Sequence, residues 1–506
     1  MKYLFTAAAL LATTSPATAQ IKLPHVFSDH AVLQRNRPLH VWGWASAKAT
    51  VVVSLHGQRV AAIADRLGRW DVWLKPEGAS GPYELVVDGG AAEGKAQVHD
   101  LMIGDVWFAS GQSNMEFPLK GFDGAPLQNS AAEIAAATNP RVRLLRLDHK
   151  ASTVPLRDID ATWTMTTPAT ATNFSAIGYF FAREIAAREH VTVGVIDSTW
   201  GGTPADSWIS IDAFGTNPAL TPAIDARARF QAEQADADLA LAAEAREDAE
   251  VRASGGKPEA HPWHPPEEAY RPSSLYNAMV APLIGYDIKG VIWYQGETNS
   301  NVIRAPYYAD LFQGLITDWR HDFAQGAFPF LYAQISSFNS PGEEWGLIRD
   351  AQRRALALTN TAMAVTTDVG NPGNVHPSDK QTVAARLALA ARAVAYGESV
   401  AYQVPLFRQL TGEPSGMRVW FDHAHGLTSR GAPVVGFEIA GADRHFVPAT
   451  ARIDGETVVV TGAVPQPRYV RYDWSGVVPG SLYNAEGLPM STFSSEERIQ
   501  GHVTYP

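Results

Sequence analysis

A candidate nucleophile, Ser113, lies in the stretch Gly111-Gln112-Ser113-Asn114-Met115. The apolar residues 106–109 come just before it and predict a short buried strand that ends in a glycine turn. A serine in such a turn lies at the edge of a sheet, where a neighbouring base can take its proton and activate it. Because a serine or asparagine that only caps the next helix gives the same local pattern, the rest of the chain has to decide between these alternatives.

Glycine and polar residues also cluster after three other predicted strands, at positions 200–204, 293–299 and 371–377. The carboxyl ends of parallel strands meet at one edge of a sheet, so we expect these clusters and the serine turn to form one site. Acyl transfer to a serine needs a base and hydrogen-bond donors for an oxyanion, and the segments together contain both.

Each of these segments has an expected part in acyl transfer. His376 is the expected base that takes the proton of Ser113. The oxyanion would be held by the Ser113 N–H, by a backbone N–H of Gly201 or Gly202, and by the side-chain amide of Asn299. A surface histidine, a turn asparagine and a plain glycine loop would each look the same in isolation, so the prediction rests on their combination.

The elements that would position these residues alternate between apolar strands and helical segments. Such alternation predicts an α/β fold with a mainly parallel sheet and helices on both of its faces. The expected strands are 106–109, 142–147, 191–196, 291–293, 330–335 and 363–366, and the expected helices include 175–188, 307–319, 347–358 and 380–396.

Short strands separated by turn signals predict all-β structure on either side of this α/β part. The pattern covers residues 21–94 before it, where it suggests a β-sandwich, and it returns after the last helix. The expected domains are therefore an N-terminal β-sandwich domain at 20–98, an α/β domain at 99–397 and a C-terminal β-domain at 398–506.

An insertion at about 210–270 interrupts the α/β pattern. Residues 222–253 are rich in Ala, Glu, Asp and Arg, which predicts a solvent-facing helix or hairpin, and a proline-rich loop follows. The insertion would be either a lid over the cleft or a solvated surface helix. His261 and His264 in the loop have a spacing compatible with a metal site, but no carboxylate completes it, and we expect no metal or cofactor.

The composition is that of a globular enzyme and disfavours several classes of partner. Of the 506 residues 46% are hydrophobic and 18% charged, which argues against disorder, and the formal net charge of −11 disfavours nucleic acid. Residues 1–19 have a short apolar core and end in Ala-Thr-Ala, so we expect a cleavable signal and a periplasmic or secreted protein without a membrane span. Cysteine is absent, which excludes cysteine catalysis.

The combined motifs resemble those of the SGNH-hydrolase superfamily, and more narrowly the sialate O-acetylesterase-like carbohydrate esterases. Besides the four site segments, residues 27–34, 275–283 and 482–489 are similar to that family, so the resemblance runs over nearly the whole chain. It implies a flavodoxin-like SGNH domain of three α/β/α layers, flanked by sandwich- or jelly-roll-like β-domains. It also implies removal of O-acetyl groups from sugars without a cofactor, by Ser113, Gly201 or Gly202, Asn299 and His376.

One position departs from the pattern of that family. The family commonly has an acidic residue two positions before the histidine, where this chain has Asn374. An aspartate there would fix the imidazole tautomer and stabilise its charged form, whereas an asparagine can only accept the N–H bond. The candidates to orient His376 are Asn374, Asp368 and Asp379, together with Asp206 and Glu297 in converging segments.

Polar and aromatic residues in the same segments are candidates for supporting roles. Gln112, Gln295 and Glu297 are expected to support the site, and Glu297 could equally be structural and orient the loop of Ser113. Rings near the strand ends could stack on sugars, although buried packing is the commoner role of such rings; the candidates are Trp200, Trp208, Trp293, Tyr294 and Trp345.

The sequence thus predicts a secreted or periplasmic serine esterase that deacetylates O-acetylated mono-, oligo- or polysaccharides through an acetyl-enzyme. A closely related alternative is an acetylesterase that acts on plant cell-wall xylan or xyloglucan. An alternative of another class is a non-catalytic carbohydrate-binding protein on the same scaffold. Asn374 favours that alternative, whereas the presence of Ser113, Asn299 and His376 argues against it.

Overall fold

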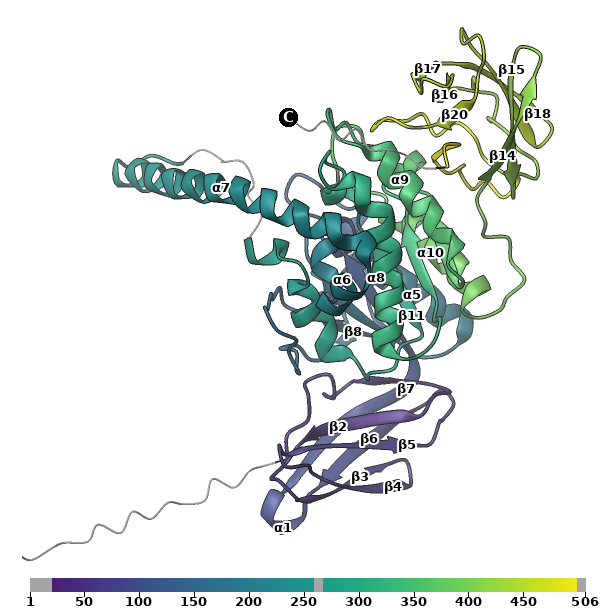
Figure 1. The fold of residues 1–506 in the computed structure, drawn as a ribbon. Coiled ribbons are helices and arrows are strands. Elements are labelled where there is room, and N and C mark those ends of the chain that lie inside the picture. Colours follow the sequence, from purple (N-terminus) through teal and green to yellow (C-terminus); the bar gives the residue numbers. More distant parts are fainter. Residues whose placement is uncertain (1–20, 259–266, 498–506) are drawn as a thin grey trace, which may run out of the picture.

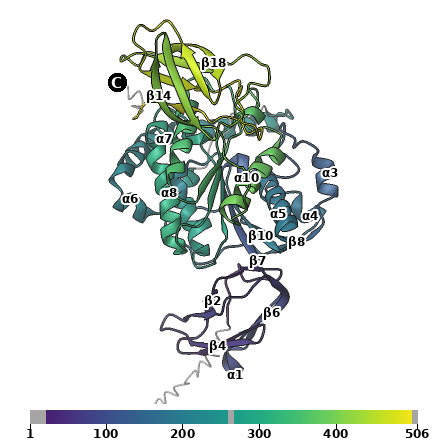
Figure 2. The same ribbon diagram turned by 90° about the vertical axis from the view of Figure 1, so that its right-hand side faces the viewer.

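The structure is a computed structural model that describes residues 21–258 and 267–497. A mixed α/β body lies between two all-β parts, with the N-terminal strands at one end of the molecule and the C-terminal strands at the other (Figures 1 and 2). The expected α/β fold with flanking β-structure is therefore present. The expected signal at 1–19, and His261 and His264, lie outside the described residues.

The central body is built on parallel strands. Along the sheet the order is β13-β12-β11-β7-β10-β8-β9, and every neighbouring pair is parallel except β8 and β9. The expected strands are thus all present, with small shifts of their ends. Their bounds are β7 Lys95–Gly111, β8 Asn139–Arg146, β9 Thr164–Thr166, β10 Val193–Thr199, β11 Gly290–Tyr294, β12 Phe330–Ala333 and β13 Thr361–Ala364.

Strand β7 belongs to both the N-terminal part and the central body. Its first half pairs with β6 (Ser80–Asp88) and β1 (Val32–Gln34), and its second half pairs with β10 and β11. One unbroken strand therefore crosses residues 98 and 99, where the sequence pattern placed a boundary. The buried side chains of both parts also belong to one continuous hydrophobic core.

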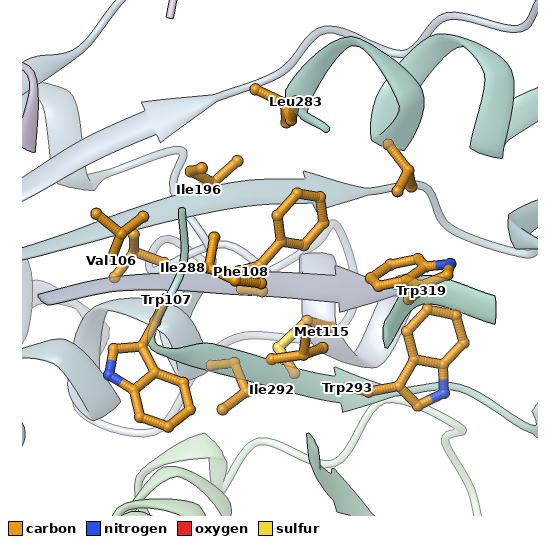
Figure 3. Packing of buried hydrophobic residues seen from close by; sticks show 14 of the residues in the cluster. Val106, Trp107, Phe108, Met115, Ile196, Leu283, Ile288, Ile292, Trp293 and Trp319 are labelled. Atoms are coloured by element: carbon orange, nitrogen blue, oxygen red, sulfur yellow. The ribbon is translucent and has the colours of Figure 1, made fainter. Parts of the chain in front are cut away.

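Helices cover both faces of the central sheet. On one face, α5 (Ala176–Glu189) packs against β7, where the rings of Trp107 and Phe181 lie 4.8 Å apart. On the other face, α8 (Tyr308–Phe323) places Trp319 5.4 Å from Phe108. Neighbouring strand residues point to opposite faces, so this pair of contacts defines the two helical layers, whose core is drawn in Figure 3.

The remaining helices lie beside these or in the connections. Helix α10 packs with α5, and α9 packs with α8. Helix α7 covers the predicted helical segment of the insertion and extends away from the body in Figure 1. The bounds are α1 Gly90–Glu93, α2 Ser113–Glu116, α3 Ser130–Ala135, α4 Pro168–Ala171, α6 Ile211–Thr216, α7 Thr221–Ala253, α9 Trp345–Arg354 and α10 Lys380–Val394. No helix within the described ranges is long and apolar enough to cross a membrane.

The flanking parts are all-β apart from α1. The N-terminal part contains β1, β2 (Leu39–Trp44), β3 (Thr50–Leu55), β4 (Gln58–Ile63), β5 (Arg69–Leu74) and β6. The C-terminal part has two four-stranded sheets around a hydrophobic core of its own. Its strands are β14 Leu406–Glu413, β15 Gly416–Asp422, β16 Phe437–Ala440, β17 Val447–Pro448, β18 Thr450–Asp454, β19 Thr457–Thr461, β20 Tyr469–Tyr472 and β21 Phe493–Ser494.

Candidate active site

The serine turn lies at the carboxyl end of β7, as the apolar run before it predicted. Gly111, the last residue of β7, has a φ of 131°, a conformation that residues with a side chain rarely adopt. A Cβ atom on this glycine would lie 2.1 Å from the carbonyl oxygen of Tyr294 on β11. Glycine therefore allows β7 to bend beside β11, and Ser113 follows as the first residue of α2.

Ser113 and His376 are brought together at this edge of the sheet. The His376 Nε2 atom lies 2.8 Å from the Ser113 Oγ atom, within hydrogen-bond distance. Burial, together with the charge of Lys380, lowers the pKa of His376 to about 4. The imidazole is consequently neutral at neutral pH, and a neutral Nε2 can accept the serine proton.

The residues predicted to orient His376 do not contact its imidazole. Asn374 accepts a hydrogen bond from the backbone N–H of His376 at 2.9 Å, not from its ring. Asp368 is paired with Arg386 through two bonds of 2.7 Å. Asp379 caps α10 by accepting from the N–H of Thr382 at 2.9 Å. This corrects the expectation, because each group is already engaged elsewhere.

The other two carboxylates considered for this role are also engaged elsewhere. Asp206 accepts from the Asn299 amide and the Tyr307 hydroxyl, both at 2.9 Å. Glu297 accepts from Asn114 Nδ2 at 2.6 Å. Across residues 21–258 and 267–497, no side chain forms a hydrogen bond with Nδ1 of His376. The ring instead packs against Phe122, with the ring centres 5.2 Å apart.

Asn299 is fully buried and is not among the residues that line the cleft around Ser113. Its Oδ1 atom accepts from the N–H of Ala205 at 2.9 Å and from Gln295 Nε2 at 2.6 Å. Its Nδ2 atom donates to Asp206, and the side chain is fully buried. The residue therefore joins the loop after β11 to the loop after β10, and the predicted role of Asn299 is corrected to a structural one.

The two glycines after β10, Gly201 and Gly202, differ in whether their backbone N–H groups are already hydrogen-bonded. The N–H of Gly201 donates to Glu116 Oε2 at 2.5 Å, so it is not available to an oxyanion as it stands. Gly202 lines the cleft, its carbonyl oxygen accepts from the Tyr270 hydroxyl, and its N–H has no partner among the described residues. Of the two predicted glycine donors, the N–H of Gly202 therefore remains available to an oxyanion.

Gln112 has an amide group whose orientation is fixed by the backbone. Its Oε1 atom accepts from the N–H of Thr298 at 3.1 Å and of Gly296 at 3.3 Å. An amide nitrogen cannot accept such bonds, so the oxygen must occupy this position and Nε2 must point elsewhere. Nε2 has no acceptor within the described part of the chain, and Gln112 lines the cleft beside Ser113. The sequence predicted only a supporting role for Gln112, not a role as a donor to the oxyanion.

A buried chain of polar groups lies behind the nucleophile. Lys380 Nζ donates to Asn114 Oδ1 at 2.5 Å, and Asn114 Nδ2 donates to Glu297 Oε1 at 2.6 Å and to the Val375 carbonyl at 3.0 Å. Burial lowers the pKa of Lys380 to about 7 and raises the pKa of Glu297. Asn114 thereby connects α2 directly to the segment that carries His376. Sequence reasoning missed Asn114 and Lys380, since nothing local distinguishes them from capping or helix residues.

An open cleft of about 770 Å³ surrounds the Ser113 and His376 pair, and its walls combine aromatic rings with polar side chains. The imidazole of His149 stacks on the half-buried Trp200 at 4.6 Å, and Glu116 Oε1 holds His149 Nε2 at 2.9 Å. The cleft rings are Phe122, His149, Trp200, Tyr270, Phe338 and Trp345.

Only part of the predicted aromatic set can meet a ligand. Trp208, Trp293 and Tyr294 are fully buried in the core, so they are packing residues. Trp200 and Trp345 line the cleft, although Trp345 is only 2% exposed. Gln295 is structural too, because its Nε2 bonds Asn299 and its Oε1 accepts from the Tyr308 hydroxyl at 3.1 Å. The described residues contain no group of three His, Cys, Asp or Glu side chains that could hold a metal ion.

Comparison with known proteins places this site in a class of esterases. The family model described as "Carbohydrate esterase, sialic acid-specific acetylesterase" matches residues 250–394. The crystal structure of a novel carbohydrate acetylesterase from Xanthomonas citri is similar to this chain, with 36% sequence identity and a TM-score of 0.79 over 94% of this chain and 100% of that one. The protein is thus a carboxylic ester hydrolase of the carbohydrate esterase class.

The curated relatives narrow the class to one family. The chain is 32% identical over 417 residues to the sialate O-acetylesterase of Mus musculus, which covers 73% of this chain and 72% of the relative. It is 31% identical over 405 residues to the sialate O-acetylesterase of Homo sapiens, covering 72% of this chain and 69% of the relative. The chain belongs to the sialate O-acetylesterase family.

Proposed function

We propose that this protein removes O-acetyl groups from carbohydrates with Ser113 as the nucleophile and His376 as the base. The observation that carries the proposal is the 2.8 Å distance between Ser113 Oγ and a neutral His376 Nε2 in the wall of a cleft. Membership of the sialate O-acetylesterase family supports the substrate class.

The reaction passes through an acetyl-enzyme. As Ser113 Oγ bonds to the acetyl carbonyl carbon, its proton moves to His376 Nε2 and the carbonyl oxygen becomes an oxyanion. Collapse of this intermediate breaks the bond to the sugar oxygen, which leaves with the proton from His376. A water molecule then attacks the acetyl carbon and gives a proton to His376 Nε2. The bond between this carbon and Ser113 Oγ breaks as Oγ takes that proton from His376, which releases acetic acid and restores Ser113.

The oxyanion is held by N–H groups of residues that line the cleft, and these groups have no hydrogen-bond partner among residues 21–258 and 267–497. The Ser113 N–H begins α2, the Gly202 N–H lies in the adjacent wall, and Gln112 Nε2 is turned away from its backbone partners. Each donor of this kind contributes about 3 kcal/mol to transition-state stabilisation in other serine hydrolases.

The Ser113→Ala variant tests the mechanism directly. Hydrolysis of 4-nitrophenyl acetate is expected to fall by about a thousandfold or more, because no nucleophile remains. Ser340→Ala is the matched control, since Ser340 lines the same cleft but bonds Glu343 and not His376. Wild-type turnover in Ser113→Ala would contradict the mechanism. An equal loss of turnover in both variants would show that the effect is not specific to the loss of the nucleophile.

The charge of the cleft favours neutral acetylated sugars over the anionic sialic acids. Its lining includes the carboxylates of Glu116 and Glu343 and one guanidinium, that of Arg304, and also Glu297, whose pKa is raised by burial. A sugar that carries its own carboxylate meets net repulsion there. Acetate release from acetylated xylan and xyloglucan is therefore expected to exceed release from O-acetylated sialic acid. The reverse order would contradict this preference.

The remaining parts of the proposal concern organisation and location. We infer a flavodoxin-like SGNH domain at 99–397 that carries the site, a β-sandwich domain at 20–98 and a C-terminal β-domain at 398–506. Helices on both faces of the parallel sheet support the assignment of the central domain. The apolar segment at 1–19 supports a periplasmic or secreted protein.

A further inference from the structure

A second large groove lies far from Ser113, against the N-terminal β-structure. It has a volume of about 650 Å³ and runs between the strand pair β2–β5 and two segments of the central body, 156–157 and 281–284. None of the residues assigned to acyl transfer lines it. The groove therefore needs an explanation of its own.

The pairing of β2 with β5 gathers aromatic rings on one face of this strand pair. In the antiparallel register His40 lies opposite Trp73, Trp42 opposite Asp71 and Trp44 opposite Arg69. Alternate residues point to opposite faces, so all six side chains share the groove face, while Leu39, Val41, Val72 and Leu74 face the core. This face is turned toward the central body, where Trp42 packs on Phe27 with the ring centres 4.7 Å apart, whereas Trp73 remains exposed.

Three of these rings form an ordered stack that is open to solvent at Trp73. The indole of Trp73 is 53% exposed and stacks on the His40 imidazole at 4.1 Å and 9°. His40 in turn lies 4.9 Å from Trp42 at 27°, and its Nδ1 atom is 3.1 Å from the Gly285 carbonyl oxygen of the central body. The ring planes are thus fixed before any ligand arrives, which lowers the entropic cost of binding.

Polar groups beside the stack match the edges of a sugar ring. The Asp71 carboxylate is 61% exposed, and one of its oxygens lies 3.5 Å from His40 Nε2. The Arg69 and Asp65 side chains lie further along the same groove. A pyranose presents C–H groups on its face, which pack on an indole, and hydroxyls on its edge, which bond to carboxylate and guanidinium groups. Arg69 and Asp65 already pair at 2.7 Å, and the Asp71 carboxylate is the more exposed acceptor beside the rings.

The groove and the active site are at opposite edges of the central sheet. Segment 281–284 precedes β11 and lies near its amino end, whereas Ser113 follows the carboxyl end of the parallel strand β7. The seven residues from Asp105 to Gly111 span roughly 20 Å, so one sugar ring cannot reach both places. A substrate that occupies both sites would therefore have to be a polymer, with one part bound in this groove and another part deacetylated at Ser113.

We propose that the groove between β2–β5 and the central body is a non-catalytic binding site for the pyranose rings of a polysaccharide, with Trp73 as its stacking platform. The choice of ligand rests on the proposed function, since the natural chain would be the acetylated polymer that the enzyme deacetylates. The site holds the protein on the polymer, and the Ser113 cleft does the chemistry.

Retardation of the full-length protein in native gels tests this site. The probes are acetylated xylan and acetylated xyloglucan, and a gel without polysaccharide is the blank. Wild-type protein is expected to be retarded by at least one polymer, and Trp73→Ala to bind it about fivefold to tenfold more weakly, as the loss of one aromatic stack predicts. Trp73→Tyr is expected to keep most of the retardation. Turnover of 4-nitrophenyl acetate should be equal in all three proteins.

Trp420→Ala is the matched control, because Trp420 is a partly exposed tryptophan on β15 of the C-terminal part. It is expected to be retarded like wild type. Absence of retardation of the wild type by both polymers, wild-type retardation of Trp73→Ala, or equal losses in Trp73→Ala and Trp420→Ala would each overturn the proposal. A failure of the proposed esterase mechanism can be told apart from a failure of this binding site. The first would appear as aryl acetate turnover in Ser113→Ala, and it would not change the retardation by polysaccharide.

Discussion

At the scale of single residues, the main feature of the site is a serine–histidine pair in which no carboxylate from the described part of the chain bonds the imidazole. In the usual triad an aspartate fixes the tautomer and stabilises the imidazolium. Here the backbone of His376 is held by Asn374, and its ring packs on Phe122. The orientation of the base is therefore provided by packing, and stabilisation of its charged form is weaker.

The low pKa of His376 predicts how activity depends on pH. The neutral imidazole is the active form, and burial and Lys380 lower its pKa to about 4. On the acid side kcat/KM for an aryl acetate should therefore stay constant down to about pH 5 and fall only as the pH passes through about 4. For an unperturbed histidine the fall would begin near pH 6.5. A pH–rate profile between pH 3 and 8, with stability checked at each pH, measures this limb.

Lys380→Met separates the effect of the neighbouring charge from that of burial. Methionine keeps a similar volume but removes the ammonium, so the pKa of His376 should rise and the acid limb should move to higher pH. Lys289→Met is a comparison variant, because Lys289 is a partly buried lysine that is not one of the charges that shift the pKa of His376. An acid limb at the same pH in Lys380→Met would contradict the electrostatic link.

The amide of Gln112 gives a second prediction at this scale. Gln112→Glu keeps the acceptor for Thr298 and Gly296 but replaces the two N–H donors with negative charge. We expect kcat to fall by about a hundredfold to a thousandfold with little change in KM, as for loss of an oxyanion donor. The unfolding midpoint should stay close to that of wild type. A raised KM with unchanged kcat would instead place Gln112 in ground-state binding.

At the scale of elements, the site depends on how β7 ends beside β11. Gly111 passes so close to the Tyr294 carbonyl that no side chain fits, and this contact sets the position of α2 and Ser113. The same strand continues backwards into the N-terminal part, where it pairs with β6. One strand therefore runs from the nucleophile into the N-terminal part, where the second groove lies on the separate β2–β5 pair.

Gly111→Ala tests the close approach of the two strands. The added methyl group would overlap the Tyr294 carbonyl and force a φ of 131°, so we expect a loss of at least about 2 kcal/mol in the free energy of unfolding. Gly215→Ala is the control, since Gly215 lies in α6 with nothing within 4 Å of its missing Cβ, and alanine favours a helix. Urea unfolding measures both. Equal stability of the two variants would mean that β7 can end in another way.

At the scale of the whole molecule, one buried arginine joins the C-terminal part to the central body. Arg349 of α9 donates to the carbonyls of Ile335 and Ser336 after β12, at 3.0 and 2.9 Å. It also donates to the carbonyls of Ser475 and Gly476 in the C-terminal part, both at 2.8 Å. The C-terminal strands have their own core, so this polar junction is a main tie between the two parts.

Arg349→Met should weaken this junction. The variant leaves several buried carbonyl groups without donors, and we expect a loss of about 3–5 kcal/mol in the free energy of unfolding, measured with urea. Arg408→Met is the control, because Arg408 forms an exposed ion pair with Asp422 at 3.4 Å and should lose less than about 1 kcal/mol. Comparable losses in the free energy of unfolding for the two variants would show that Arg349 does not stabilise the junction.

The sequence by itself determined the features that depend on the pattern of residues over short stretches of the chain. The apolar run before Ser113, the alternation of strands and helices and the glycine and polar clusters at strand ends predicted the parallel sheet. They also predicted that Ser113 and His376 meet at one edge of it. These predictions succeed because periodicity fixes which face a residue occupies, and parallel strands present their carboxyl ends together.

Only the tertiary structure decided which partners each polar side chain has. Asn299 and Gly201 carry the residue types of oxyanion donors, yet Asp206 and Glu116 accept their hydrogen bonds. Gln112, by contrast, has an amide that is free because two backbone N–H groups hold its oxygen. Such choices depend on groups far apart in sequence that compete for the same hydrogen bonds within about 3 Å, and no local pattern records that competition.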